Sequence, residues 1–410
     1  MWENRRRRNT IIKIILLIVA VGLAAVLVIG MKYVTAQANA QEQAISEVSS
    51  RKQDEQTAVK EESLEQISAD YQADLDAIAQ YMPGIVCWGD TLTAGSVSGV
   101  SYPQALQDLI KENIIDAYDF RGTLDYADNI SRVNWDDYTV DIQVVNMGSG
   151  DETTDTILGR NGAVPFVAAS SFTIPADTEA VQITLKSANG DEVAPLTAGN
   201  AGVNNVTIAG IEGPLSLSSE TTLYSNNRKY YFTRLEAGEA VEIPAGTEIV
   251  TAASEMYSDY ITVIYIGTYG GYSSVEELIS QQKAIIEHQT GNKDRYIIVG
   301  LCYLPTVLNG GTAKNFEQYE TAMQQEFGNH FVNVRKYLVT EAMTDAKLTA
   351  TSNDKKQMSS GYVPDSLRAS SGSKELNSTA YKLIGKLIYD RMTQLGYFDE
   401  ITDELGIKLK

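Results

Sequence analysis

The sequence predicts an α/β protein whose main domain contains a parallel, doubly wound sheet. Short apolar runs alternate with helical segments over 84–164 and again over 256–398, and this alternation is typical of parallel β-α-β architecture. Between them, residues 165–255 hold many short β-type runs separated by Gly, Asn and Pro, which predicts an inserted all-β module. An apolar segment at 14–31 predicts one membrane-spanning helix ahead of both.

The predicted span is 18 consecutive apolar residues (14–31), close to the roughly 20 that cross a bilayer as a helix. A basic tail (1–13) with four consecutive arginines precedes it, and the segment that follows is acidic. Because positive charge stays on the cytoplasmic side, we expect a single-pass cell-membrane protein with an extracellular C-terminal domain. A cleaved signal peptide is the alternative, since Ala38-Asn39-Ala40 has the small-x-small form of a cleavage site.

Residues 32–82 are predicted to form a helical stalk. The segment 41–82 is polar and contains neither Gly nor Pro. Its apolar residues are spaced three or four apart and so form one stripe: Leu64, Ile67, Tyr71, Leu75, Ile78 and Met82. Such a stripe fits either a helix packed on the next domain or a short coiled coil.

Five strands and four helices are expected in the α/β domain. The strands are expected at 84–88, 140–147, 260–266, 296–301 and 331–334, and helices near 104–111, 275–287 and 315–327. Asn377 or Ser378 is expected to cap the last helix, whose apolar face contains Ile384, Leu387, Ile388, Met392 and Leu395. Ligands of such sheets bind at the carboxyl ends of the strands.

The inserted module (165–255) is expected to be a β-sandwich or a barrel, with runs such as 181–185 and 230–233 as strands. Two roles stay open for it, which are ligand or glycan binding and a purely structural insertion.

Composition excludes some partners. The formal net charge of −20 argues against nucleic acid, which needs a basic footprint. Cys87 and Cys302 are too few for a disulfide framework, and each lies in an apolar run, which predicts two buried thiols.

Four turns carry a family resemblance. They are Gly-Asp-Thr-Leu-Thr-Ala-Gly (89–95), Asn-Met-Gly-Ser-Gly-Asp-Glu-Thr-Thr (146–154), Ile-Gly-Thr-Tyr-Gly-Gly (266–271), and Pro-Asp-Ser-Leu (364–367) with Leu376-Asn377. In order and in placement they resemble the conserved blocks of the SGNH (GDSL-type) hydrolases. The resemblance covers 84–164 and 256–398 and implies a three-layer, flavodoxin-like domain with an esterase site.

At each catalytic position of that family this sequence has a different residue. The resemblance places Thr91 at the serine nucleophile, Asp151 and Tyr269 at the glycine and asparagine of the oxyanion hole, and Gly372 and Glu375 at the aspartate and histidine. We therefore expect no functional catalytic residue.

The substitutions weaken each catalytic role. The methyl group of Thr91 crowds the attack, and a hydroxyl without a base is a poor nucleophile. Glu375 has a reference pKa of about 4.3, which makes it a weaker base than imidazole. Asp151 places negative charge where an oxyanion would develop, and losing one donor there already costs about 10²–10³ in rate.

No other residue pattern supports catalysis. His288 and His330 precede predicted strands and are expected to be solvated residues at the opposite edge of the sheet. No His, Cys or carboxylate cluster has metal-ligand spacing, and the Gly148-x-Gly150 turn lacks the rest of a dinucleotide fingerprint. We therefore expect neither a metal nor a cofactor.

Two function classes follow from the resemblance. The first is an inactive, membrane-anchored surface protein that binds a cell-wall glycan or a surface protein through Asp90, Thr91, Asp151, Tyr269 and Glu375 or through the β module. The second is an active carbohydrate or acyl esterase that uses Thr91 with Glu375.

Overall fold

The computed structural model describes residues 84–95, 99–115, 142–187, 190, 193, 202–217, 230–308 and 313–404. The expected basic tail (1–13), membrane span (14–31) and stalk (32–82) lie outside these residues. Within the described ranges, no helix is both long and apolar enough to cross a bilayer.

The chain divides into two compact units. The first contains 84–109 and 143–397, and all the described strands belong to it. The described part of the second includes the π-helical turn η1 (Lys111–Ile115) and helix α14 (Asp399–Glu404).

A five-stranded parallel sheet forms the core of the first unit, which confirms the expected α/β class. In spatial order its strands are β2 (Val144–Gly148), β1 (Ile85–Gly89), β13 (Ile261–Tyr265), β14 (Tyr296–Val299) and β15 (Phe331–Val332). All four neighbouring pairs are parallel. The chain adds β2 on one side of β1 and then β13 on the other, so the strand order reverses between β1 and β13, where ligands of open α/β sheets bind.

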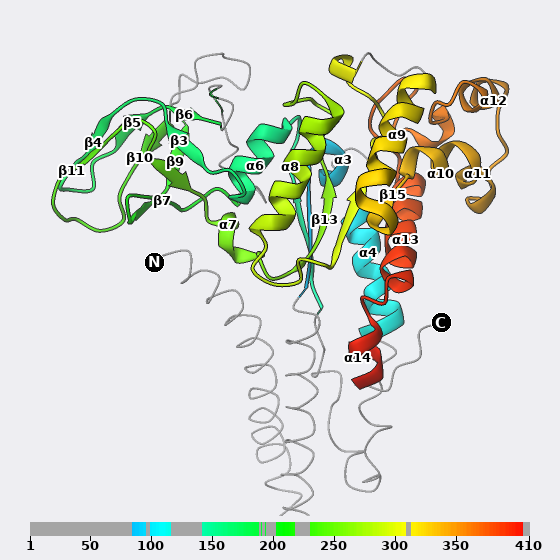
Figure 1. Cartoon of the computed structure of the whole chain (residues 1–410), viewed down its shortest axis with the longest axis horizontal. Coiled ribbons are helices and arrows are strands. Elements are labelled where there is room, and N and C mark those ends of the chain that lie inside the picture. Colours follow the sequence, from blue (N-terminus) through cyan, green and yellow to red (C-terminus); the bar gives the residue numbers. More distant parts are fainter. Residues whose placement is uncertain are drawn as a thin grey trace, which may run out of the picture. The chain divides into compact units, whose positions relative to one another are not determined.

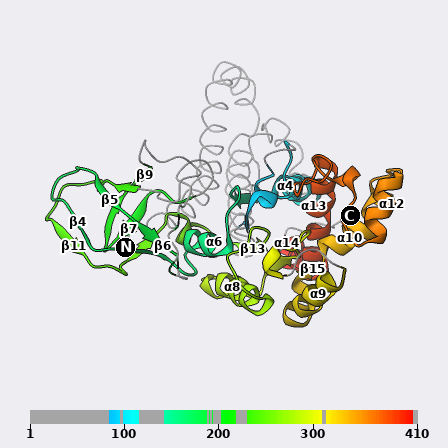
Figure 2. The same cartoon turned by 90° about the horizontal axis from the view of Figure 1, so that it is seen from above.

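The central strands are apolar because both of their faces are covered. Every residue of β1 and β13 is buried, as expected for parallel strands between two helical layers. The view from above shows α8 and α9 on one face of the sheet and α4 and α13 on the other (Figure 2).

The helices follow the strands in the expected alternation (Figure 1). They are α3 (Thr91–Ala94), α4 (Tyr102–Ile110), α6 (Thr154–Asn161), α7 (Ala253–Met256), α8 (Val275–His288), α9 (Ala313–Phe327), α10 (Val334–Thr340), α11 (Ala342–Asp345), α12 (Ser352–Ser359) and α13 (Ser378–Gln394). Short 3-10 turns occur at η4 (Thr306–Leu308), η5 (Gly328–His330) and η6 (Asp365–Leu367).

Side-chain caps fix where several helices begin. Asn377 accepts a hydrogen bond from the Ala380 amide and caps α13, so the first of the two expected caps is the one used. Ser274 caps α8 in the same way. Thr351 and Asp354 form a reciprocal capping box on α12, a signal that the sequence carries but that the prediction missed.

The described residues between β2 and β13 form ten short strands in three antiparallel sheets, and the turn spacing of this segment predicts such short strands. Their orders are β6-β3-β12-β7-β8, β5-β10-β9 and β11-β4. The strands are β3 (Phe166–Ala168), β4 (Phe172–Ile174), β5 (Val181–Ile183), β6 (Leu185–Lys186), β7 (Val206–Ile208), β8 (Ile211–Gly213), β9 (Leu215–Leu217), β10 (Tyr230–Phe232), β11 (Val241–Ile243) and β12 (Glu248–Val250).

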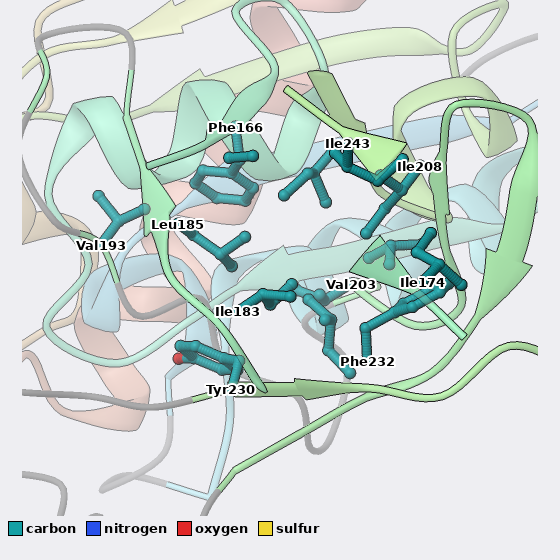
Figure 3. Close-up of a cluster of buried hydrophobic side chains, with 14 residues drawn as sticks. Phe166, Ile174, Ile183, Leu185, Val193, Val203, Ile208, Tyr230, Phe232 and Ile243 are labelled. Atoms are coloured by element: carbon teal, nitrogen blue, oxygen red, sulfur yellow. The ribbon is translucent and has the colours of Figure 1, made fainter. Parts of the chain in front are cut away.

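This β module has its own hydrophobic core (Figure 3). Aromatic and branched side chains from several strands meet there, and Phe166, Phe232 and Ile249 are fully buried. A run expected as one strand (181–185) belongs to two sheets, since β5 pairs with β10 and β6 with β3. Alternation therefore predicts the strands, but it does not predict how they group into sheets.

The two cysteines are buried and free, as predicted. Burial raises the pKa of both thiols, that of Cys302 to about 12. Both thiols are therefore protonated and unreactive at neutral pH.

Candidate functional site

The carboxyl edge of the sheet is tightly packed where β1 and β2 end. A Cβ atom at Gly148 would lie 2.2 Å from the Ala94 amide nitrogen, and one at Gly89 would lie 2.6 Å from the Tyr265 carbonyl oxygen. Only glycine fits such approaches, so these two glycines let β1, β2, β13 and α3 converge. The residues that follow each strand are thereby brought to one place.

Asp90 is the first polar residue of this edge, and it is fully buried. Its Oδ1 accepts a hydrogen bond from the Leu92 amide at 2.9 Å and its Oδ2 accepts one from the Thr268 amide at 3.3 Å. Burial raises the pKa of Asp90 to about 7; hydrogen bonds to Leu92 and Thr268 oppose this shift, and the Glu152 carboxylate adds to it. Asp90 therefore caps α3 and joins the turn after β13 to the turn after β1.

Thr91, which the resemblance places at the nucleophile position, is buried beside Asp151. Its Oγ1 donates to Asp151 Oδ1 at 3.3 Å and accepts from the Asp151 amide at 2.7 Å. Asp151 has a left-handed backbone (φ 55°), a conformation that glycine adopts freely and that aspartate tolerates. The amide that the resemblance assigns to the oxyanion hole thus donates to the hydroxyl of Thr91 itself.

Tyr269 lies next to both residues. Burial raises the pKa of Tyr269, a hydrogen bond with Thr91 opposes that shift, and the carboxylates of Asp151 and Asp90 add to it. The turn that carries Tyr269 is tied to the start of α6, because the Thr154 amide donates to the Gly270 carbonyl and its hydroxyl donates to the Gly271 carbonyl, each at 2.9 Å. The phenol is therefore held beside Thr91 and Asp151.

Glu375 reaches the same cluster from the loop before α13. Burial and the charge of Asp151 raise the pKa of Glu375, which places the two carboxylates near each other. No hydrogen bond joins the described side chains of Glu375 and Thr91. Glu375 therefore feels the charge of Asp151 but, among the described residues, makes no hydrogen bond to the hydroxyl for which the alternative function needs it as a base.

Gly372 occupies a different environment. It is exposed, has a left-handed backbone (φ 75°), and donates its amide to Asp365 Oδ1 at 3.3 Å. A Cβ at this position would meet no atom within 4 Å. An aspartate there would have the space it needs and, as at Asp151, would have to adopt a left-handed backbone, which aspartate tolerates at more cost than glycine.

Sequence reasoning missed a buried ion pair directly beneath the cluster. Arg160 is fully buried, and its guanidinium donates to Glu152 at 2.6 and 3.1 Å. It also donates to the Met147 carbonyl at 2.9 Å and lies 5.2 Å from the Trp88 ring centroid. In the sequence, Arg160 lies eight residues after Glu152. That spacing alone does not predict an ion pair, because only tertiary packing brings the two side chains together.

The two histidines lie at the amino edge of the sheet, as expected, but the prediction that both are solvated is wrong. His330 is half-buried, stacks on Tyr296 with ring centroids 4.2 Å apart, and has its Nδ1 2.8 Å from the Tyr397 hydroxyl. His288 is half-buried, with Nε2 2.7 Å from the Ser254 carbonyl oxygen. Apolar and aromatic neighbours bury part of each ring, and the remaining polar atom finds a hydrogen-bond partner.

The cluster of Asp90, Thr91, Asp151, Tyr269 and Glu375, hereafter the Thr91 cluster, combines hydroxyl and carboxyl groups without an imidazole. Among the described residues, no group of three or more His, Cys, Asp or Glu is arranged to hold a metal ion. Asp151 is exposed, Tyr269 and Glu375 are half-buried, and Asp90 and Thr91 are buried. A ligand at the surface would therefore meet two carboxylates and a phenol before it met the threonine.

Comparison with family models, with curated proteins and with solved structures found no significant match to this chain.

Proposed function

We propose that this chain is a membrane-anchored surface protein with an SGNH-hydrolase-like domain that binds a cell-surface glycan or protein and does not hydrolyse esters. The observation that carries the proposal is the state of the Thr91 hydroxyl, which is held between the amide and the carboxylate of Asp151. That arrangement uses the amide required for an oxyanion and keeps a negative charge at the same place.

The absence of a strong base supports the same conclusion. Both histidines of the chain lie at the opposite edge of the sheet, and a carboxylate removes a hydroxyl proton far less well than imidazole does. A buried threonine with only carboxylates beside it is suited to shaping a binding surface.

The test is an esterase assay on the full chain purified in detergent, at high protein concentration, with p-nitrophenyl acetate and acetylated xylan. We expect no turnover above background. Turnover that disappears in Thr91→Ala would overturn the proposal, because it would show that Thr91 is a nucleophile.

Partial restoration provides a second, independent test. Because the residues of a triad act as a unit, neither Thr91→Ser alone nor Glu375→His alone is expected to create activity. Recovery is expected to require Thr91→Ser, Asp151→Gly, Tyr269→Asn, Gly372→Asp and Glu375→His together. Activity from Thr91→Ser alone would show that a competent base is already present.

The second candidate function is an active carbohydrate or acyl esterase with Thr91 as nucleophile and Glu375 as base. The raised pKa of Glu375 favours it, since a general base works best with a pKa near the working pH. In that case Glu375→Gln would abolish turnover and remove the acid limb of the pH–rate profile.

The anchoring proposal has its own test. We expect the full chain to fractionate with membranes and external protease to remove everything beyond about residue 40, since basic residues precede the 14–31 span and acidic ones follow it. Protection of the C-terminal domain in intact cells would reverse the proposed orientation, and a soluble form that begins at Gln41 would show that the segment is cleaved.

A further inference from the structure

A lysine side chain of the protein lies over the exposed side of the Thr91 cluster. The ammonium nitrogen of Lys374 lies 5.2 Å from the centroid of the Tyr269 ring. The face of an aromatic ring carries a negative potential that attracts ammonium groups within about 6 Å. Lys374 is exposed and Tyr269 half-buried, so this ring face accepts a primary ammonium group at the surface of the molecule.

Two carboxylates lie beside the ring. Asp151 shares two hydrogen bonds with Thr91 and one with Tyr269, and Glu375 directly follows Lys374, whose ammonium group lies over the Tyr269 ring. Burial, and then the charge of Asp151, raise the pKa of Glu375. Among the residues that the structure describes, no arginine or lysine forms an ion pair with either carboxylate. Like charges held together without a direct ion-pair partner favour the binding of a positive group.

These features define an ammonium site whose aromatic face is already contacted by the chain's own Lys374. We propose that Tyr269, Asp151 and Glu375 bind the ammonium group of an amino sugar, and that Lys374 competes with this ligand for the Tyr269 ring. This inference rests on the proposed binding function and deepens it by naming the class of glycan, one that carries free amino groups.

An amino sugar fits the cluster better than a lysine side chain of a protein partner. Beside its ammonium group a sugar has C–H groups that can pack on an aromatic face and hydroxyl groups that can donate to the Asp151 and Glu375 carboxylates. A lysine would offer only an ammonium group on a flexible chain, which is what Lys374 already supplies.

The test is calorimetric titration of the full chain in detergent with a glucosamine tetramer and with its fully N-acetylated counterpart. Both have the same sugar backbone, but only the first carries positive charge. We expect the free-amine tetramer to bind at least about tenfold more tightly, which corresponds to the loss of one favourable charged contact in the acetylated form.

The variants separate this site from general attraction to a protein of charge −20. Removing the competitor with Lys374→Ala is expected to tighten binding about two- to fivefold, whereas Lys355→Ala, which removes an equal charge from an exposed position on α12, changes nothing. Glu375→Gln is expected to weaken binding. Tyr269→Phe retains the ring and so retains binding, whereas Tyr269→Leu loses it.

Three outcomes would overturn the inference. Equal or tighter binding of the acetylated tetramer would show that the site reads the sugar and not its charge, and the proposed glycan-binding function would survive. Tighter binding of a lysine-containing peptide would show that the partner is a protein. An unchanged affinity in Lys374→Ala would show that Lys374 does not occupy the ligand's place. The esterase assay tests the proposed function separately, because Thr91-dependent turnover there would contradict that function whatever the tetramers do.

Discussion

At the carboxyl edge of the parallel sheet, Thr91 and Asp151 share hydrogen bonds and Glu375 lies near Asp151, so the polar groups face one another and reach the surface. At the amino edge, His330 stacks on Tyr296 and contacts Tyr397, so aromatic rings cover part of the imidazole. The groups that would form an esterase site together are thus divided between opposite edges. One edge has a hydroxyl and carboxylates, and the other has the imidazoles.

The geometry of the carboxyl edge is separate from the side chains that it presents. The turns converge because of the strand order and because the backbone comes very close at Gly89 and Gly148. Neither condition depends on which side chain is present at position 91 or 375. Charge pairing beneath the turns maintains this geometry, so the largest predicted effects concern that pairing.

The largest expected effect is on stability, from the Glu152–Arg160 pair beneath the carboxyl edge. Glu152→Gln would leave a fully buried guanidinium without its counter-charge, and breaking such a pair costs about 3–5 kcal/mol of unfolding free energy. Urea denaturation of the full chain measures it. Glu326→Gln is the control, since its pair with Lys283 is exposed and such surface pairs add little stability. Equal losses in the two variants would show that the buried pair does not maintain this edge.

The second effect concerns the network that holds the loop carrying Glu375. Asp354 is buried and accepts hydrogen bonds from Ser366 (3.0 Å from the amide, 2.7 Å from the hydroxyl) and from the amide and hydroxyl of Thr351 (2.9 and 2.7 Å). Asp354→Asn would turn an amide group toward these donors, and unsatisfied buried groups cost about 1–3 kcal/mol. Asp390→Asn, at an exposed pair with Lys386, is the control and is expected to lose far less.

The same carboxylate predicts a pH dependence with a definite sign. Burial alone would raise the pKa of Asp354, but hydrogen bonds from Ser366 and Thr351 lower it to about 2. A depressed folded-state pKa stabilises the fold above the unfolded value of about 3.9, and this stability is lost as the pH falls toward 2. The difference in unfolding free energy between wild type and Asp354→Asn should therefore shrink between pH 5 and pH 2. A constant difference would contradict this assignment.

Much of the fold is predictable from sequence because burial leaves a strong signal. Four of the five strands of the parallel sheet are almost wholly apolar, and β1 and β13 are buried at every residue. Helix α6 was missed because its eight residues are largely polar; packing, together with the left-handed Gly162 after its last turn, stabilises it in place of propensity.

The site was predictable only where turns have a recurring shape. The turns that carry Thr91, Asp151 and Tyr269 follow strands whose ends must meet, so their proximity could be expected. The Glu152–Arg160 pair and the seat of Lys374 on Tyr269 could not be predicted, because no periodicity relates such side chains. The burial of the histidines was missed for the same reason, since the rings that cover His330 come from Tyr296 and Tyr397.

A smaller effect tests whether the amino edge is only structural. His330→Leu would remove the Nδ1 contacts with the Tyr397 hydroxyl (2.8 Å) and the Tyr296 carbonyl (3.0 Å), and we expect a loss of about 1 kcal/mol of unfolding free energy. His288→Leu is a matched control for removing an imidazole at this edge. Neither change should alter ligand binding at the Thr91 cluster, and a change in affinity without a change in stability would argue that the two edges are coupled.

The smallest expected effect is a pH dependence of amino-sugar binding. Acidification should slightly stabilise the free protein, but it should weaken the binding of the ligand. Burial and the neighbouring Asp151 raise the pKa of Glu375, and burial together with the charge of Glu375 raises the pKa of Tyr381. Because the folded protein holds this proton more tightly than the unfolded chain, acidification through the raised pKa slightly stabilises the free protein. The same protonation removes a negative charge that an ammonium ligand needs, so where the sugar amines stay protonated the affinity for a glucosamine tetramer should fall as the pH drops through the raised pKa of Glu375. In Glu375→Gln the affinity should already be lower and should not show this fall, whereas Glu326→Gln should behave as wild type. An affinity that rises on acidification over this range in the wild type would contradict the role of Glu375. A fall that persists in Glu375→Gln would assign the titration to another group, and Asp90, whose pKa burial raises to about 7, would then be the first to replace.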